Sequence, residues 1–503
     1  MSIHHLALLA GLFVVPTLAL AVGYRFSKRS RRTRAIFWGA VIGHSVATVV
    51  ASIASIWPPR ALGPDDELRA ALILWMLLLG GIAGAMVALL RHSARTHLAP
   101  AMVATIATIG VLAAADACSG NGEQVAMLGA LELLESPAPP GSREPNLTST
   151  GDGRVLMTWT ERGADSVYAL RIATLEGDRW GEPATIARSR PFFVNWADFP
   201  SAIVLPDGRV AAHWLERSAG GTYQYDVRIA QSADGGRTWS DGLLPHRDGT
   251  LSEHGFTTMY DAGRGLLGAV WLDGRRFAAV PPTKEMTLAH TTVAADGALG
   301  PELIIDERIC ECCQTSGAMT AVGPVIVYRD RSSDEVRDIS IVRLVDGVWT
   351  VPKPVHEDRW EVHHCPVNGP AVAAADRAVV VAWYTEAGDT ARVFVAFSDD
   401  AGGTFGPPVR VDDGAPLGRV DVELLGDGAA AVSWLERTDA GGEVRLRTVS
   451  RRGRVTDHIV VGLTTANRPS GFPRMARQGD RLILTWTVPG SPSRVELAAV
   501  PIE

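Results

Sequence analysis

A short strand-like segment that ends in an aromatic residue recurs about every fifty to sixty residues after residue 140. A charged run often follows at once, as in Trp434-Leu-Glu436-Arg437. The seven aromatic positions are Trp159, Trp214, Trp271, Tyr328, Trp383, Trp434 and Trp486. Each unit has room for about four short strands, and repeats of this kind are typical of propeller blades. The pattern predicts an all-β propeller over residues 142–503, with seven blades favoured and six as the alternative.

The seventh unit is too short for four strands. After Phe472 it has room for about three strands before Glu503. Residues 119–141 form a linker, and its apolar stretch Val125–Glu135 is the candidate for the missing strand. Pairing of these two segments would close the ring and leave no open inner edge.

Two eight-residue stretches, 232–239 and 398–405, share the pattern Ser-x-Asp-x-Gly-x-Thr-Trp/Phe. The shared positions are Ser232, Asp234, Gly236, Thr238 and Trp239 in the first, and Ser398, Asp400, Gly402, Thr404 and Phe405 in the second. In such a turn the Asp side chain can accept backbone hydrogen bonds, and Gly supplies a positive φ. The pattern resembles the Asp-box (BNR repeat) of sialidase-like β-propellers. The resemblance implies a propeller, whereas the box itself, as a fold element, says little about activity.

The first 118 residues differ in composition and contain four apolar runs, at 6–23, 35–57, 70–90 and 98–117. Each run is about as long as the roughly 20 residues that a helix needs to cross a bilayer. The loops after the first and third runs carry Arg and Lys, so the positive-inside rule places both loops in the cytoplasm. About four transmembrane α-helices are therefore expected, with the propeller on the extracytoplasmic side, periplasmic or external. Cys118, at the end of the fourth run, is either lipidated or an unmodified helix end.

The segments that lead into each blade's first strand should share one face with the loops after the second strands. These lead-in segments are polar, and the second-strand ends add Arg and carboxylate groups. The candidates for ligand binding are Arg217, Arg329, Arg331, Asn368, Arg419 and Arg468. Such a channel mouth suits an anionic or glycan ligand, although the charges could instead pair with one another. The net charge of −7 gives no indication of nucleic-acid binding.

The segment that begins at Phe199-Pro200 is the part most similar to sialidases, which carry a substrate-gripping Arg just before that Pro. Asp198 stands near this position here, and Tyr384 is the last tyrosine, whereas sialidases use a late Tyr as nucleophile. The usual sialidase hydrolysis is therefore not expected. An exo-α-sialidase or related glycoside hydrolase with a rearranged site is the alternative, because two suitably spaced carboxylates suffice for many glycosidases. The candidate catalytic carboxylates are Asp198, Glu216, Asp330 and Glu436.

Cysteine and histidine gather in the lead-in segments of the fourth and fifth units, at 310–313 and 363–365. Equivalent segments of adjacent blades should be neighbours. Three interpretations stay open: a disulfide between Cys365 and a cysteine of the fourth unit, a zinc or copper site, and inert thiols. The metal ligands would be Cys312, Cys313, His363 and Cys365.

Taken as a whole, the sequence predicts a membrane-tethered, extracytoplasmic propeller that recognises an anionic or glycan ligand at its channel mouth. A glycoside hydrolase and a metal-binding protein are the two alternatives. The expected partners are the membrane and the ligand.

Overall fold

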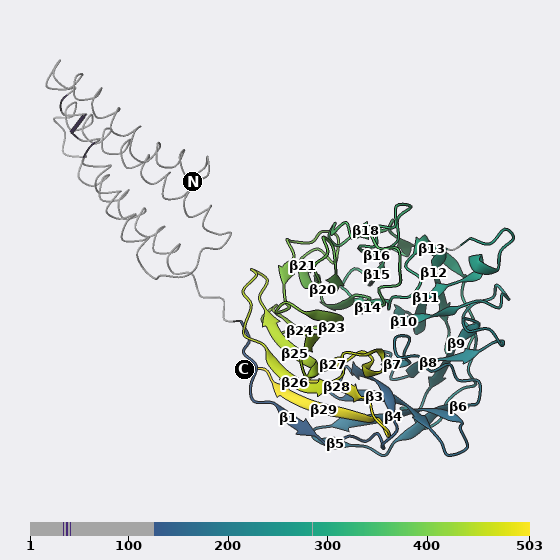
Figure 1. Cartoon of the computed structure of the whole chain (residues 1–503). Coiled ribbons are helices and arrows are strands. Elements are labelled where there is room, and N and C mark those ends of the chain that lie inside the picture. Colours follow the sequence, from purple (N-terminus) through teal and green to yellow (C-terminus); the bar gives the residue numbers. More distant parts are fainter. Residues whose placement is uncertain (1–33, 35–36, 39–40, 42–124, 284) are drawn as a thin grey trace. The chain divides into compact units, whose positions relative to one another are not determined.

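The computed structural model describes residues 34, 37–38, 41, 125–283 and 285–503. The chain divides into two units, Met1–Gly122 and Glu123–Glu503, and the second unit is a ring of seven β-sheets (Figure 1). The prediction of seven blades is confirmed and the six-bladed alternative is wrong, because each aromatic repeat belongs to a sheet of its own.

The predicted membrane segment, residues 1–118, lies outside the described residues, apart from Arg34, Phe37, Trp38 and Val41. Within the described part of the chain, no helix has the length and apolar character needed to span a bilayer. The transmembrane helices and the lipidation of Cys118 stay predictions.

Each blade is an antiparallel sheet whose first strand lines the channel. Blade 1 contains β2 (Arg143–Ser149), β3 (Val155–Arg162), β4 (Tyr168–Glu176), β5 (Arg179–Trp180) and β6 (Ala184–Ser189). Blade 2 contains β7 (Ser201–Val204), β8 (Val210–Arg217) and β9 (Tyr225–Ser232). Blade 3 contains β10 (His254–Gly263), β11 (Leu266–Asp273), β12 (Met286–Val293) and β13 (Leu303–Ile309), with η2 (Arg275–Ala278) after β11. Blade 4 contains β14 (Ser316–Met319), β15 (Pro324–Arg329), β16 (Ile339–Val345), β17 (Val348–Trp349) and β18 (Lys353–Pro354).

The last three blades complete the ring. Blade 5 contains β19 (Ala371–Ala375), β20 (Ala378–Thr385), β21 (Arg392–Ser398) and β22 (Val409–Arg410). Blade 6 contains β23 (Pro416–Leu424), β24 (Ala430–Thr438), β25 (Gly441–Val449) and β26 (Ile459–Thr464). Blade 7 contains β27 (Arg474–Gln478), β28 (Arg481–Val488) and β29 (Arg494–Pro501), preceded by η3 (Arg468–Ser470). Its outermost strand is β1 (Glu132–Leu134), which pairs with β29 and lies within the stretch that the sequence offered for ring closure.

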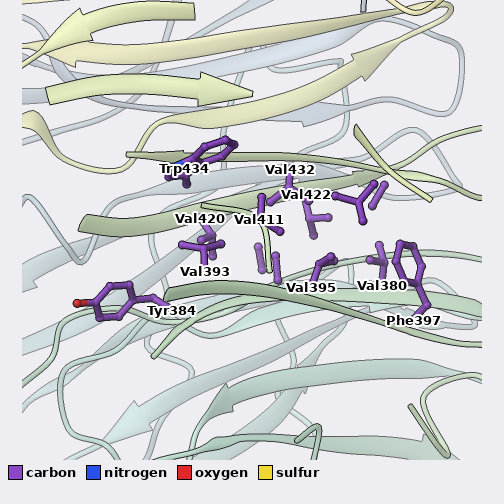
Figure 2. Close-up of a cluster of buried hydrophobic side chains, with 14 of the residues drawn as sticks. Val380, Tyr384, Val393, Val395, Phe397, Val411, Val420, Val422, Val432 and Trp434 are labelled. Carbon is purple, nitrogen blue, oxygen red and sulfur yellow. The ribbon is translucent and has the colours of Figure 1, made fainter. Parts of the chain in front are cut away.

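The hydrophobic core lies between the blades. Each of seven buried clusters joins two neighbouring blades, so the ring is held by one apolar layer per junction. Figure 2 shows the junction of blades 5 and 6, where Val380 and Val393 face Val422 and Val432. Burying one such valine contributes about 1.5–3 kcal/mol. The second strands are apolar on both faces because both faces meet a neighbouring blade.

The two eight-residue turns have the contacts that their sequence pattern indicates. Asp400 accepts hydrogen bonds from the backbone N–H and the hydroxyl of Thr404, both at 2.8 Å, and from Ser398 Oγ at 2.8 Å. Gly402 has φ +79°. The 232–239 turn repeats this arrangement. Trp239 and Phe405 pack against the clusters between neighbouring blades, so the turns serve the architecture at the outer edge.

Candidate functional site

A cavity of about 1050 Å³ lies at the channel mouth. Its lining comes from the lead-in segments of several blades and from the loops after the second strands β8, β11 and β15, as propeller geometry predicts. The residues that carry chemistry are Trp196, Tyr223, Glu253, Phe277, Glu311, Cys312, Arg331, Glu335, Arg337, His363, Cys365 and Arg468. Of the predicted residues, Cys312, Arg331, His363, Cys365 and Arg468 are therefore brought to one cavity.

Several other polar residues of the first strands and their lead-ins act as latches between blades. Each accepts a hydrogen bond from a backbone N–H of the next blade. The four pairs are Asp198 with Phe256 N (2.8 Å), Gln314 with Gly369 N (2.9 Å), Asn368 with Arg419 N (2.8 Å), and Asp421 with Met475 N (2.8 Å). A satisfied backbone donor in a buried junction stabilises the fold. These side chains are polar because the junctions need acceptors, which explains part of the pattern that suggested a ligand site.

Asp198 also takes part in a contact of three acidic groups. Tyr225 Oη lies 3.2 Å from Asp198 Oδ2 and 2.5 Å from Glu253 Oε1. One phenol has one proton and cannot donate to both carboxylates. Burial raises the pKa of Asp198 to about 8 and that of Glu253 to about 7, so a second proton is shared in this group. Gly255 permits the approach, since a Cβ there would lie 2.1 Å from Asp198 Oδ2.

Only Glu253 of this trio lines the mouth cavity, while Tyr225 and Asp198 are buried behind it. The sequence singled out Asp198 but missed Tyr225 and Glu253. Glu253 lies in the segment that leads into β10, but nothing in the local sequence shows that a tyrosine of the preceding blade reaches it.

Two arginines of the mouth are held by carboxylates. Arg337 Nη1 lies 2.9 Å from Glu311, and its Nη2 lies 2.9 Å from Glu335. Arg331 Nη2 lies 2.7 Å from Glu335. Glu311, Glu335 and Arg337 were not among the predicted residues, although the run after β15 pointed to their neighbourhood.

Arg468 differs from these two arginines. It is exposed, lies 5.9 Å from the centre of the Trp196 ring, and forms no ion pair within the described part of the chain. Arg419 lies 4.9 Å from the same ring but is buried and donates to the backbone carbonyls of Asn467 and Gly471. Arg468 is thus the cation most available to a ligand.

The other predicted ligand-binding residues lie elsewhere. Arg329 is buried and donates to three backbone carbonyls, those of Asn368, Arg337 and Tyr384. Asn368 is a latch, and Arg217 lies over the ring of Phe193 outside the mouth cavity. The structure thus places Arg217, Arg329, Asn368 and Arg419 away from the cavity lining.

The carboxylates after the blade tryptophans have a structural role. Trp434 Nε1 donates to Glu436 at 2.6 Å, and Glu436 also accepts from Ala415 N at 2.7 Å. Trp214 Nε1 donates to Glu216 at 3.1 Å. Residues i and i+2 of a strand lie on the same face, so an acid at i+2 can reach the indole. Glu216 and Glu436 therefore hold buried indoles and do not line the mouth cavity.

Asp330 is also engaged within its own blade. It accepts from Arg331 N at 2.7 Å and from Ser340 Oγ at 3.0 Å, and burial raises its pKa to about 6. It does not line the mouth cavity.

The cysteines cluster as expected but form no disulfide among the described residues. Cys310 Sγ lies 3.1 Å from Cys313 Sγ and 3.8 Å from Cys312 Sγ, and Arg337 Nη1 lies 3.5 Å from Cys310 Sγ. The expected staple between Cys365 and blade 4 is therefore not present: Cys365 is an exposed thiol whose Sγ lies 3.9 Å from Glu311. The three sulfurs of blade 4 lie within 4.8 Å of one another and could hold a soft metal ion. His363 is exposed and contacts Glu361 at 3.1 Å.

These features define the class: a seven-bladed β-propeller with a polar, partly aromatic cavity at the mouth of its channel. No family model matches the chain, and no curated protein matches it.

Several solved structures are similar to this chain over about three quarters of its length. One is a protein of unknown function from Dyadobacter fermentans DSM 18053, with 16% identity, 76% of this chain and 100% of that chain covered, and a TM-score of 0.45. Another is the NanB sialidase from Streptococcus pneumoniae, with 13% identity, 72% and 68% covered, and a TM-score of 0.39. A third is the polysaccharide lyase Uly1, with 10% identity, 73% and 91% covered, and a TM-score of 0.45. Similarity at this level assigns no activity to the chain.

Proposed function

We propose that this protein is a sialidase-like propeller that binds an acidic glycan in the mouth cavity. The observation that carries the proposal is the pairing of Arg468 with aromatic rings, since Trp196 and the exposed Tyr223 and Phe277 line the same cavity. Sugar rings stack on aromatic faces, and a guanidinium binds a sugar carboxylate by charge-assisted hydrogen bonds. Arg331 and Arg337 are held by Glu311 and Glu335, which leaves Arg468 as the cation for the ligand.

Binding of acidic and neutral oligosaccharides to the purified full chain tests this proposal. Sialyllactose and a uronate-containing oligosaccharide are compared with lactose by calorimetry. Arg468→Ala should weaken binding of the acidic sugars by about tenfold or more, since a hydrogen bond to a charged group contributes roughly 1.5–3 kcal/mol. Arg217→Ala is the matched control, because Arg217 is exposed but lies outside the cavity. Equal losses in both variants, or no binding of any sugar, would refute the proposal.

A second candidate is turnover of the bound glycan. Its basis is the 2.5 Å contact between Tyr225 and Glu253, which combines a phenol with a carboxyl group that lines the cavity. Sialidases use a tyrosine paired with a glutamate, although their tyrosine comes late in the chain. A fluorogenic sialoside and an unsaturated-product assay on uronates test hydrolysis and elimination. Activity that survives both Glu253→Gln and Tyr225→Phe would exclude this pair.

The chain is further proposed to be tethered in a membrane, with the propeller outside the cytoplasm. The four apolar runs and the basic loops between them support this topology. Fusions of a periplasm-dependent reporter to the loops and to the propeller would test it. A cytoplasmic propeller would refute the orientation, and mass spectrometry of the Cys118 peptide decides between a lipid-modified and a free thiol.

Zinc or copper binding is proposed at the thiols of blade 4. The supporting observation is that Cys310, Cys312 and Cys313 offer three sulfurs within 4.8 Å of one another. Cys365 would be the fourth ligand, whereas His363 contacts Glu361. Elemental analysis of the protein purified without chelator, with and without Cys312→Ser, tests this proposal. An unchanged metal content in the variant would refute it.

A further inference from the structure

The lining of the mouth cavity has two chemically different sides. Blade 4 contributes ion-paired residues such as Arg331 and Glu335. Blades 2 and 3 contribute three large side chains that are apolar or aromatic and nevertheless exposed: Tyr223 (64% exposed), Leu251 (56%) and Phe277 (37%). Large apolar side chains that share one exposed surface mark a place where another molecule binds. The ion pairs of blade 4 do not account for this apolar side of the cavity.

The apolar side borders Glu253. Leu251 lies two residues before Glu253, in the segment that leads into β10. Phe277 belongs to η2, and hydrogen bonds of the main chain tie this turn to the same segment. Phe277 N donates to Gly274 O at 2.9 Å, and Gly274 N donates to Glu253 O at 2.8 Å. The segments that carry Leu251 and Phe277 are thus held together before any ligand arrives, which lowers the cost of binding.

The arginines next to Phe277 are already paired with carboxylates. Arg275 Nη2 lies 2.7 Å from Asp273 Oδ2, and Arg276 Nη1 lies 3.2 Å from Glu285 Oε2. An acidic group of a ligand would therefore gain little on this side of the cavity. An apolar group would gain more, because its contact with Phe277 removes apolar surface from water on both partners.

The cation of the cavity comes from other segments of the ring. Arg468 belongs to η3, before blade 7, and Trp196 belongs to the segment that leads into blade 2. A sugar carboxylate at Arg468 with its ring at Trp196 would leave Leu251 uncovered. Leu251 is aliphatic, so it offers no flat ring on which a second sugar could stack. A single ligand that covers both sides must combine an acidic sugar with an apolar group.

We propose that the mouth cavity binds a soluble acidic glycoside whose apolar aglycone, a short alkyl chain or an aryl ring, covers Tyr223, Leu251 and Phe277. This inference rests on the proposed function and names the class of its ligand. The cavity of about 1050 Å³ is at the upper end of the range for small-molecule sites, so a sugar and an aglycone fit in it together.

The test compares aglycones on the same sugars. Sialyllactose and the uronate-containing oligosaccharide, each as its methyl and its octyl glycoside, are titrated into the full chain below the concentration at which octyl compounds form micelles. The octyl glycoside should bind at least about tenfold more tightly than the methyl glycoside, since burial of two methylene groups has about this effect. Octyl lactoside, which lacks the acid, should bind at least about tenfold more weakly than the acidic octyl glycosides.

Variants locate the gain in affinity. Leu251→Ser should lower the ratio of octyl to methyl affinity by at least about threefold and leave the methyl glycoside unaffected. Phe277→Ser should lower the ratio as well, and the ratio is compared because lost stacking would weaken both glycosides alike. Leu463→Ser is the matched control, since Leu463 is 63% exposed on β26 and lies outside the cavity lining. Nonspecific partitioning of the octyl chain would be the same in all variants, and Arg468→Ala should weaken both glycosides without changing the ratio.

The outcomes separate this inference from the proposed function. If none of the acidic glycosides binds, the proposed function fails and this inference fails with it. If the methyl glycosides bind and the octyl glycosides bind no better, this inference alone is overturned. Equal ratios in Leu251→Ser and Leu463→Ser would overturn it as well. Binding to ganglioside vesicles without any gain for the soluble octyl glycosides would assign the apolar side to a membrane lipid, and self-association that Leu251→Ser abolishes would assign it to a second copy of the chain; either result overturns the proposal.

Discussion

Replacement of Asp198 by Asn should make the protein more stable as the pH rises, relative to the wild type. The carboxyl group is buried and has a pKa of about 8, against an ordinary value of 3.8. The groups that face it are Tyr225, Glu253 and the backbone N–H of Phe256. An amide can keep both contacts, because its oxygen accepts from Phe256 N and its NH₂ donates to Tyr225. The chain already uses amides in this role at Gln314 and Asn368.

The sign and size of the effect follow from proton linkage. A carboxyl group whose folded pKa is raised keeps its proton in the folded state while the unfolded chain loses it. Its stabilising contribution is complete below about pH 4 and is lost as the pH rises towards 8. Each pH unit in this window costs about 1.4 kcal/mol per proton. From pH 5 to pH 7, wild type should therefore lose about 3 kcal/mol relative to Asp198→Asn.

Urea unfolding of both full-length proteins at pH 5, 6 and 7, followed by tryptophan fluorescence, measures this difference. Asp400→Asn is the control, because the pKa of Asp400 is held at about 2 by its turn and the group is ionised throughout the window. The Asp400 variant should be less stable than wild type by a constant amount. A difference between Asp198→Asn and wild type that does not change with pH would show that Asp198 is ionised and would refute the reasoning.

Three further predictions concern the architecture and the thiols. Glu436→Ala should lower the unfolding free energy by about 2–4 kcal/mol, because Trp434 Nε1 and Ala415 N lose their acceptor. Glu161→Ala removes only a 3.7 Å ion pair with Arg171 and should cost less than about 1 kcal/mol. Equal urea midpoints for the two variants would contradict this prediction. Asp400→Ala should destabilise the protein by about 1–2 kcal/mol, because its turn loses the hydrogen bonds from Thr404, and glycan affinity should not change. Asp399→Ala, at the exposed neighbouring position, should change stability by less than about 0.5 kcal/mol. Of the described cysteines, Cys365 should be alkylated first, since it is exposed while Cys310 and Cys313 are buried; peptide mapping that finds Cys313 labelled first would contradict this.

The fold was largely predictable because the residues that identify each repeat are the ones that the blades must bury. Every blade needs an apolar second strand with a large side chain at its end, and five of the seven aromatic repeats, among them Trp159 and Trp486, are fully buried tryptophans. The ring-closing strand was also accessible, since a short last unit requires a partner from elsewhere in the chain. These are properties of residue type and spacing alone.

The site was only partly predictable. Propeller geometry placed Arg331 and Arg468 at the mouth, but it could not separate a free arginine from one bound to a carboxylate of another segment. Glu216 and Glu436 accept hydrogen bonds from indoles outside the mouth cavity, and a signal for this contact existed: an acid two residues after a strand tryptophan lies on the same face as the indole. Tyr225 and Glu253 meet only because blade 2 packs on blade 3, and no local pattern shows this contact.

Asp198 has a structural role at the junction of two blades and a second role beside Tyr225 in the candidate site, and comparison with the other latch residues separates the two. A ring alone needs an acceptor at this junction, and an amide is sufficient, as Gln314 and Asn368 show. A buried carboxyl in the same place destabilises the folded protein at neutral pH relative to an amide, since its pKa is raised to about 8. Unlike an amide, the Asp198 carboxyl group provides Tyr225 with a second acidic partner besides Glu253. Asp198→Asn therefore separates the two roles: the ring should persist, and any reaction that moves a proton through Tyr225 and Glu253 should be altered.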